Sequence, residues 1–246
     1  MTKRTAFLIT TTSILFAAAT GAAHAANGFG VHDIYFELNV TADDVGLHAL
    51  TDEPDWRSMT IKGPGGFIVI KVAPGQTSAR DGLTELFFEG NEPTLDERSF
   101  KDLITLFPPG TYTWTGLALD NTPLRSTDVL TTVLPCPPIV QTPVIRKGDL
   151  SVYWRLVNGV YDPDSGVCST KSSASIIGIE VTVELTDIAT DVTRHLVVDL
   201  PPGATSVEVP DEFLRGAIPG ATDAKAVVLV KEKSNNRTEV EASFDF

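Results

Sequence analysis

The stretch Ser175–Leu185 reads SIIGIEVTVEL, and the fold of the second half depends on its pattern. Apolar, mostly β-branched residues alternate there with Glu and Thr, which is typical of a strand with one buried face. Similar runs lie on both sides, with Pro, Gly and Asn turns between them. This spacing predicts a β-sandwich of about 100 residues. The expected strands are Asp149–Leu156, Ser175–Leu185, His195–Leu200, Ser206–Val209, Ala224–Lys231 and Glu239–Phe246.

Four segments of this region resemble parts of a fibronectin type III domain, an immunoglobulin-like β-sandwich. The first, Leu150–Trp154, resembles an early strand of the family that ends in a buried Trp. The other three are Ile177–Val183, Thr205–Pro210, and the hairpin Val227–Asn236 followed by Thr238. The resemblance covers Ile139–Phe246 and implies an all-β second half. The segment Asn158–Ser173 is long for a connecting loop of this family. Sandwiches of this kind host many functions, so the resemblance implies none in particular.

The first half has β patterns of its own. Ile34–Val40 alternates, and the apolar runs Met59–Ile61 and Phe67–Val72 flank a Gly-rich turn. Thr84–Phe88 and Thr111–Leu119 are further strand candidates. These patterns predict a second sandwich-like β-domain, and a single mixed fold is the alternative.

One helix is expected in the first half, with Thr94 as its N-cap and Glu97 completing a capping box. Its apolar face would consist of Phe100, Leu103, Ile104 and Phe107. The predicted fold class is therefore mainly all-β, with two sandwich-like domains, the first carrying one short helix. The predicted segments are 1–25 as signal peptide, 26–134 as first domain, 135–143 as Pro-rich linker and 144–246 as fibronectin type III-like domain.

Residues 1–25 have the organisation of a cleaved signal peptide. Lys3 and Arg4 form a positive region, Ala6–Ala19 is apolar, and Ala23–Ala25 places small residues where a signal peptidase cuts. The apolar run is shorter than the roughly 20 residues that a spanning helix needs. We therefore expect cleavage at the end of this segment, a periplasmic or secreted protein, and no stable membrane insertion.

The chain is acidic, with a formal net charge of −13 from 19 Lys and Arg against 32 Asp and Glu. Proteins bind nucleic acids and anionic membranes through Lys and Arg that displace counterions. The charge therefore argues against both partners. It fits a soluble protein, or one that meets cations or a basic partner.

Two cysteines are present, Cys136 and Cys168. In an oxidising compartment we expect a disulfide between them. It would close a loop of about 30 residues and stabilise the fold by roughly 3 kcal/mol. Two free thiols, one of them reactive, are the alternative.

No catalytic motif appears in the sequence. His32, His48 and His195 show no metal-binding spacing, and there is no nucleophile elbow, phosphate loop or dinucleotide fingerprint. A triad or a pair of carboxylates that assembles only in space stays open as an alternative. No cofactor is expected, with one weak exception for Ca²⁺.

The exception is an acidic region in which Asn39, Asp43 and Asp44 offer oxygen ligands to Ca²⁺. This region lacks the Gly and the final Glu of an EF-hand, so an irregular site and solvated loop acids are the alternatives. Trp56 and Trp114 are candidates for a binding surface, where Trp is enriched, or for core packing.

Together these features favour a non-catalytic binding or scaffolding protein whose partner outside the cytoplasm is a protein or a glycan. One alternative is an extracytoplasmic hydrolase with an acidic site in the first domain. The other is a periplasmic assembly chaperone with two immunoglobulin-like domains, although no match appears for the basic anchor that such chaperones carry.

Overall fold

The computed structural model describes residues 28–73, 75–146, 149–215, 217 and 222–245. Strands dominate this part of the chain and its helices are short, so the mainly all-β prediction is confirmed. The predicted signal peptide, 1–25, lies outside the described residues. None of the helices in the described segments is long and apolar enough to cross a membrane.

The second half is a sandwich of two antiparallel sheets. One sheet has the order β14-β13-β16-β17, and the other has β10 at its centre between β15 and the short edge strands β8 and β9. This strand order confirms the fibronectin type III-like sandwich. The strands are β8 (Ile139–Val140), β9 (Val144–Arg146), β10 (Asp149–Arg155), β13 (Ile176–Asp187), β14 (Val192–Leu200), β15 (Ser206–Val209), β16 (Thr222–Glu232) and β17 (Arg237–Asp245).

Alternation along the strands builds the core between these two sheets. Val181 of β13 faces Val228 of β16 in the ladder, and both are fully buried. Trp154 packs against them from β10 and is 3% exposed, as the resemblance predicted. The helix α3 (Asp211–Leu214) adds Leu214 to the same cluster.

The first half is a second sandwich, and one long strand contributes to both of its layers. The strand β2 (Asp44–Lys62) pairs with β1 (Val31–Asn39) and β4 (Leu83–Glu89) in its first part. Its second part pairs with β3 (Ile68–Val72) and β5 (Gly110–Ala118), and β6 (Pro123–Leu130) follows β5.

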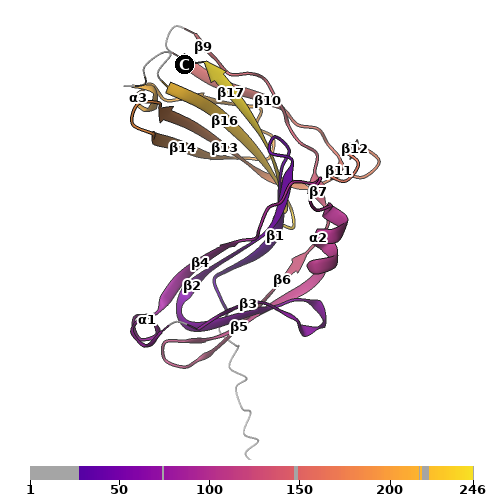
Figure 1. Ribbon diagram of the computed structural model, residues 1–246, viewed down its shortest axis with the longest axis vertical. Helices are drawn as coiled ribbons and strands as arrows, with labels where there is room; N and C mark the ends of the chain where they lie inside the picture. Colours follow the sequence, from indigo (N-terminus) through magenta and orange to yellow (C-terminus); the bar gives the residue numbers. More distant parts are fainter. Residues whose placement is uncertain (1–27, 74, 147–148, 216, 218–221, 246) are drawn as a thin grey trace, which may run out of the picture.

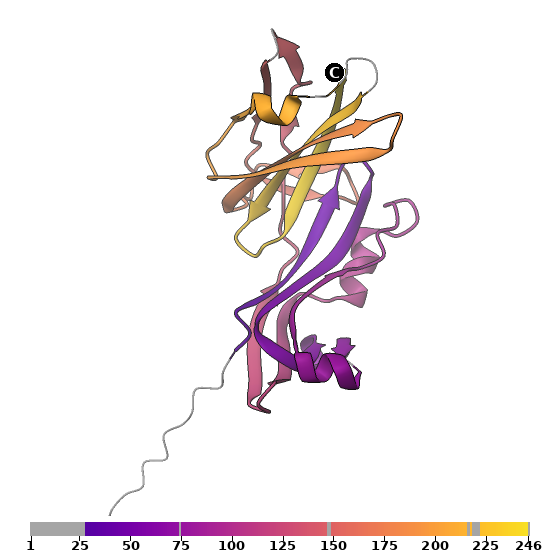
Figure 2. The same ribbon diagram turned by 90° about the vertical axis from the view of Figure 1, so that its left-hand side faces the viewer.

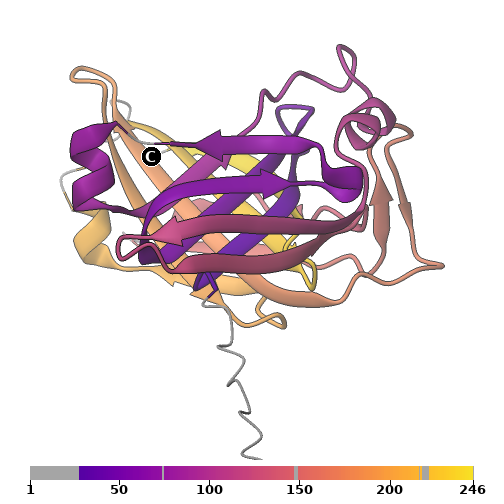
Figure 3. The same ribbon diagram turned by 90° about the horizontal axis from the view of Figure 1, so that it is seen from below.

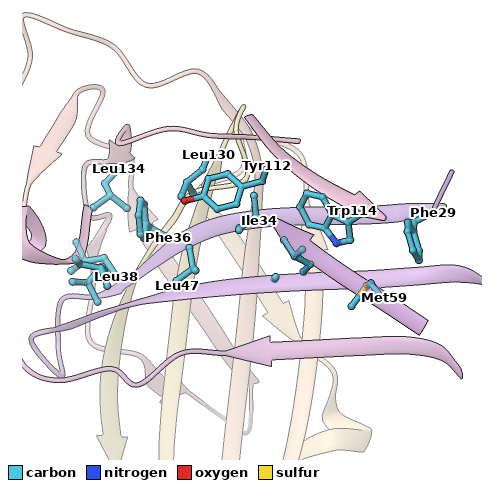
Figure 4. Packing of buried hydrophobic residues seen from close by; sticks show 14 of the residues in the cluster. Phe29, Ile34, Phe36, Leu38, Leu47, Met59, Tyr112, Trp114, Leu130 and Leu134 are labelled. Atoms are coloured by element: carbon cyan, nitrogen blue, oxygen red, sulfur yellow. The ribbon is translucent and has the colours of Figure 1, made fainter. Parts of the chain in front are cut away.

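The change of layer occurs at Glu53, whose φ is +44°, and at the register shift between Asp52 and Trp56. The acidic region 52–55 is therefore the bend of a strand. A hydrogen bond of 2.9 Å from the Trp114 indole to the Thr51 hydroxyl crosses the core beside this bend. Figure 4 shows the buried side chains from β1, β2, β5 and β6 that meet in the core.

The predicted helix exists but begins later than expected. The helix α2 spans Phe100–Leu106, and its N-cap is Ser99, whose hydroxyl accepts from the backbone N–H of Asp102 at 3.1 Å. Thr94 and Glu97 do bond to each other, but they stabilise a separate turn, so the predicted cap is wrong. A second helix of the first half, α1 (Gln76–Asp81), and the 3-10 turn η1 (Pro64–Gly66) were not predicted.

The long segment after β10 belongs structurally to the first half. Its strands β11 (Val160–Asp162) and β12 (Val167–Ser169) form a small sheet with β7 (Leu134–Pro135). Asp164, at the tip of this hairpin, accepts hydrogen bonds from the backbone N–H groups of Phe100 and Lys101 at 2.6 and 3.0 Å. The first turn of α2 is thus capped from a segment more than 60 residues away in the chain.

The two sandwiches share one sheet. β1 runs parallel to β17, with the register pairs Glu37↔Arg237, Leu38↔Thr238 and Asn39↔Glu239. We call this pairing the joint. It makes a continuous sheet of the order β14-β13-β16-β17-β1-β2-β5-β6.

Figure 1 shows β1 passing between the two halves, and Figure 2 shows α2 close to the joint. In Figure 3 the strands of the first half run across those of the second. Because β1 and β17 are parallel neighbours in one sheet, this crossing reflects the twist of the shared sheet.

Candidate functional site

The joint has an outer face, which we define as the side of the shared sheet opposite both cores. Residues of the cores alternate with the residues of this face along each strand. Leu38 and Thr238 point inward, and their neighbours Glu37 and Arg237 therefore point outward.

A row of cationic and aromatic side chains crosses this face from β17 to β4. The Arg237 guanidinium lies 3.9 Å from the centre of the Tyr35 ring. Tyr35 stacks on His48 at 5.4 Å, and His48 lies 5.7 Å from Phe87. Tyr35 and His48 are almost fully buried, whereas Phe87 is 50% exposed. The row therefore anchors an exposed aromatic side chain to the joint.

Charged contacts hold this row in place. The Glu37 carboxylate lies 3.5 Å from the Arg237 guanidinium, and Nε2 of His48 lies 2.7 Å from Oε1 of Glu92. Glu92 reaches His48 by crossing Gly46, where any Cβ would collide with the Glu92 carboxylate. A glycine at 46 is therefore a requirement of the Glu92–His48 contact.

Carboxylates crowd around the joint on the same face. Burial raises the pKa of Glu239 to about 7, and repulsion from Glu37 and Glu241 adds to this. Burial also raises the pKa of Asp44 to about 6, with Glu92 as the largest repulsive neighbour. Neither carboxylate has a hydrogen-bonding or ionic side-chain partner among the residues that the structure describes. The charge of Lys225 offsets part of the rise in the pKa of Glu239.

One lysine forms ion pairs with two other carboxylates of this face. The Lys225 ammonium lies 3.3 Å from Glu184 and 3.2 Å from Glu241. Burial alone would lower the pKa of Lys225, but the hydrogen bonds and charges of Glu241 and Glu184 outweigh burial and raise it. The cluster therefore combines compensated pairs with unpaired carboxylates.

The residues proposed for Ca²⁺ lie at one end of this face, in the β1–β2 turn. The Asn39 side-chain oxygen accepts the backbone N–H groups of Thr41 and Ala42, both at 2.9 Å, and its amide donates to Glu241 at 3.0 Å. Asp43 occupies the left-handed position of the turn, with φ +59°. Within the described ranges, no group of three or more His, Cys, Asp and Glu side chains is arranged to hold a metal.

The predicted disulfide is confirmed, since Cys136 and Cys168 are bonded and their Cα atoms lie 5.6 Å apart. Gly159 packs directly against both sulfur atoms. Trp56 and Trp114 are both fully buried in the first core, which is the core-packing alternative.

Sequence reasoning missed most of the site. The alternation of Ile34–Val40 places Tyr35 and Glu37 on one side of a strand, and the strand candidate Thr84–Phe88 contains Phe87, but neither pattern indicates a site. Arg237 and Glu239 lie about 200 positions away in the chain, where an alternating strand was the only signal. The sequence held no signal that these strands become neighbours.

No family model matches the chain, and no curated protein matches it. Solved structures do show similarity. A tetra-tandem repeat from the extending region of a large adhesion protein is 14% identical over 88% of this chain and 49% of that one, with a TM-score of 0.29. A segment of two fibronectin type III domains from chicken tenascin is 11% identical over 87% of this chain and 98% of that one, also at 0.29. The chain thus spans about half the length of the first of these.

Three such domains from chicken CNTN1 are 12% identical over 87% of this chain and 62% of that one, with a TM-score of 0.31. Because these values are low, the fold of the second half rests on its strand order. That order defines an all-β protein with a fibronectin type III-like sandwich.

Proposed function

We propose that the protein is a non-catalytic binding or scaffolding protein that works outside the cytoplasm, in the periplasm or as a secreted protein. The observation that carries the proposal is the joint between β1 and β17, which makes one sheet of two sandwiches. We take 26–134 and 144–246 as the two domains of the chain and 135–143 as the connection between them, with β8 of the connection pairing with the second domain and the β11–β12 hairpin docking on the first. A scaffold benefits from this arrangement because a shared sheet fixes the relative position of its two halves.

The outer face is the proposed binding surface. Its row of side chains ends at Phe87, and the exposed residues Glu85 and Glu89 flank that ring on β4. Half-exposed aromatic side chains on rigid strands are suitable anchors for a protein or glycan partner. The acidic surroundings favour partners other than nucleic acid.

The disulfide supports the location outside the cytoplasm. Bonds such as that of Cys136 and Cys168 persist in oxidising compartments and are rare in the cytosol. Fractionation of the native organism tests this part. The chain should be recovered outside the cytoplasm with the disulfide intact, and a cytoplasmic chain with two free thiols would contradict it.

Site-specific photocrosslinking tests the binding surface. A photoreactive phenylalanine analogue replaces Phe87 in one strain and Tyr153 in another, because both side chains are 50% exposed and Tyr153 lies on the distant β10. We expect a defined crosslinked partner from position 87 and none from position 153.

Equal crosslinking at both positions, or none at either, would contradict the proposed face. A purified protein that hydrolyses a glycan or peptide, and loses this activity in Asp44→Asn, would favour the hydrolase instead.

A further inference from the structure

The strand β14 is a free edge of the shared sheet, and among the described strands it pairs only with β13 (Figure 1). An edge strand presents a row of unpaired N–H and C=O groups to any strand that approaches it. Proteins usually protect such an edge with Pro, Lys or a bulge. The nine residues of β14 include neither Pro nor Lys, and their ladder with β13 has no register shift. This edge is therefore open to another strand.

The hydrogen-bonding pattern identifies which backbone groups of β14 are free. The Glu232 N–H donates to the Asn236 carbonyl at 3.0 Å, so even-numbered residues of β16 bond to β17. Bonding direction alternates along an antiparallel strand, so odd-numbered residues of β16 bond to even-numbered residues of β13. Odd-numbered residues of β13 then bond to even-numbered residues of β14. The residues of β14 with free N–H and C=O groups are therefore Thr193, His195, Val197 and Asp199.

The side chains of these four residues lie on the outer face, because Leu196 and Leu200 between and beside them pack against the second core. Val197 is 55% exposed. Asp199 makes no ion pair within the part of the chain that the structure describes. In the ladder it lies opposite Glu180, a second carboxylate, which is an unfavourable pairing. A hydrogen-bond donor or cation arriving at the free edge would therefore stabilise Asp199.

We propose that β14 pairs with β14 of a second copy of this chain, antiparallel and about a two-fold axis at Val197. In this register His195 of each copy lies opposite Asp199 of the other, and the two Val197 side chains lie opposite each other. Directly opposite residues of an antiparallel pair point to the same face and interact. The imidazole can therefore donate to the carboxylate, and this contact occurs twice because the interface is two-fold symmetric.

Charge selects this register among the symmetric ones. An axis at His195 would place Asp199 opposite Asp191 and the two imidazoles opposite each other. An axis at Leu196 or at Val198 would leave Asp199 opposite an uncharged residue. We favour a second copy over a strand of another protein because β14 itself supplies both members of the complementary pair. This association does not depend on the binding role proposed above.

Sedimentation equilibrium of the chain with its disulfide intact tests the association. Salt at about 150 mM screens the repulsion between two acidic chains. A single pair of strands is smaller than a standard interface, so we expect a reversible dimer with a Kd on the order of 10 to 100 μM. A chain that is still monomeric at about 1 mM would overturn the proposal.

Amide exchange measured by NMR in a concentration series locates the contact. At about 1 mM the Val197 and Asp199 amides should gain about fivefold protection by mass action, whereas the Val198 amide, which already bonds to β13, should change little. Equal gains at Val197 and Val198 would contradict the pairing. So would protection that appears only when another protein is added, since the edge would then have a different occupant.

Two charge variants test the register. His195→Asp places two carboxylates opposite each other at both ends of the contact, and Asp199→His does the same with two imidazoles. Each variant alone should associate at least about tenfold more weakly. An equimolar mixture of the two should form a heterodimer as tightly as the unaltered protein, because both complementary pairs return. Undiminished association of either variant, or a mixture that does not associate, would overturn the register.

A further variant, Val197→Lys, places two ammonium groups opposite each other at the axis and should abolish the dimer. Its matched control is Val129→Lys on the edge strand β6, where the side chain is 51% exposed, and this control should dimerise normally. Equal effects of the two substitutions would contradict the assignment to β14. Measurements of distances within one chain are made after dilution with an excess of unlabelled chain, so that contacts between labelled copies do not contribute.

Discussion

The side-chain oxygen of Asn236 accepts a hydrogen bond at 2.8 Å from the backbone N–H of Phe36, a residue 200 positions earlier in the chain. The Asn236 amide also donates to the carbonyls of Thr131 and Val133, both at 3.0 Å. Asn236 is fully buried. One side chain therefore connects β1, the entry to β17 and the segment that leads to β7.

Removing this side chain should destabilise the whole molecule. Asn236→Ala removes the partner of the buried Phe36 N–H and of the two half-buried carbonyls, at a cost of about 3 kcal/mol. Chemical denaturation measures the loss, with the exposed Asn91→Ala as control. A loss no larger than that of the control would show that the Asn236 contacts do not hold the two halves together.

The Asp164 cap on α2 should depend on the disulfide. Asp164→Ala should cost about 1 kcal/mol, the usual value of a lost helix cap. In the variant Cys136→Ser/Cys168→Ser the hairpin that carries Asp164 is less constrained, so the same substitution should cost less. A double-mutant cycle measures this coupling in unfolding free energy, and strictly additive losses would contradict it.

The contact between Glu92 and His48 should require Gly46. Gly46→Ala forces Glu92 away from His48, and we expect a loss of about 1 to 2 kcal/mol. Glu92→Ala should cost a similar amount, and the double variant should cost little more than either alone. Gly203→Ala is the control, because open space surrounds that position. Losses that simply add would indicate two unrelated effects.

The sandwich of the second half could be predicted because each of its strands shows a regular alternation of apolar and polar residues, which is visible locally in the sequence. Pairings such as β16 with β17 require only a short turn at Asn235 and Asn236, which the sequence signals. The helix α2 was also predicted, but its start was misplaced because Thr94 and Glu97 satisfy the capping pattern in a turn just before it. Ser99 is the residue that directly precedes the first turn of the helix.

The joint and its site could not be predicted from the sequence. β1 and β17 belong to different sandwiches and lie about 200 positions apart in the chain, and parallel pairing of such distant strands leaves no local pattern. The strand signal at Ile34–Val40 identified which side Glu37 faces, without indicating that Arg237 would lie beside it. The bend of β2 was equally hidden, because Asp52–Asp55 has the composition of a loop.

The joint makes one rigid body of two sandwiches. Electron–electron distance measurements between spin labels at Glu85 and Val197, exposed outer-face positions on β4 and β14, test this rigidity. We expect one narrow distance distribution, which broadens when Asn236→Ala is introduced. A broad distribution in the protein with Asn236 intact, or no change in the variant, would show that the joint does not fix the two sandwiches.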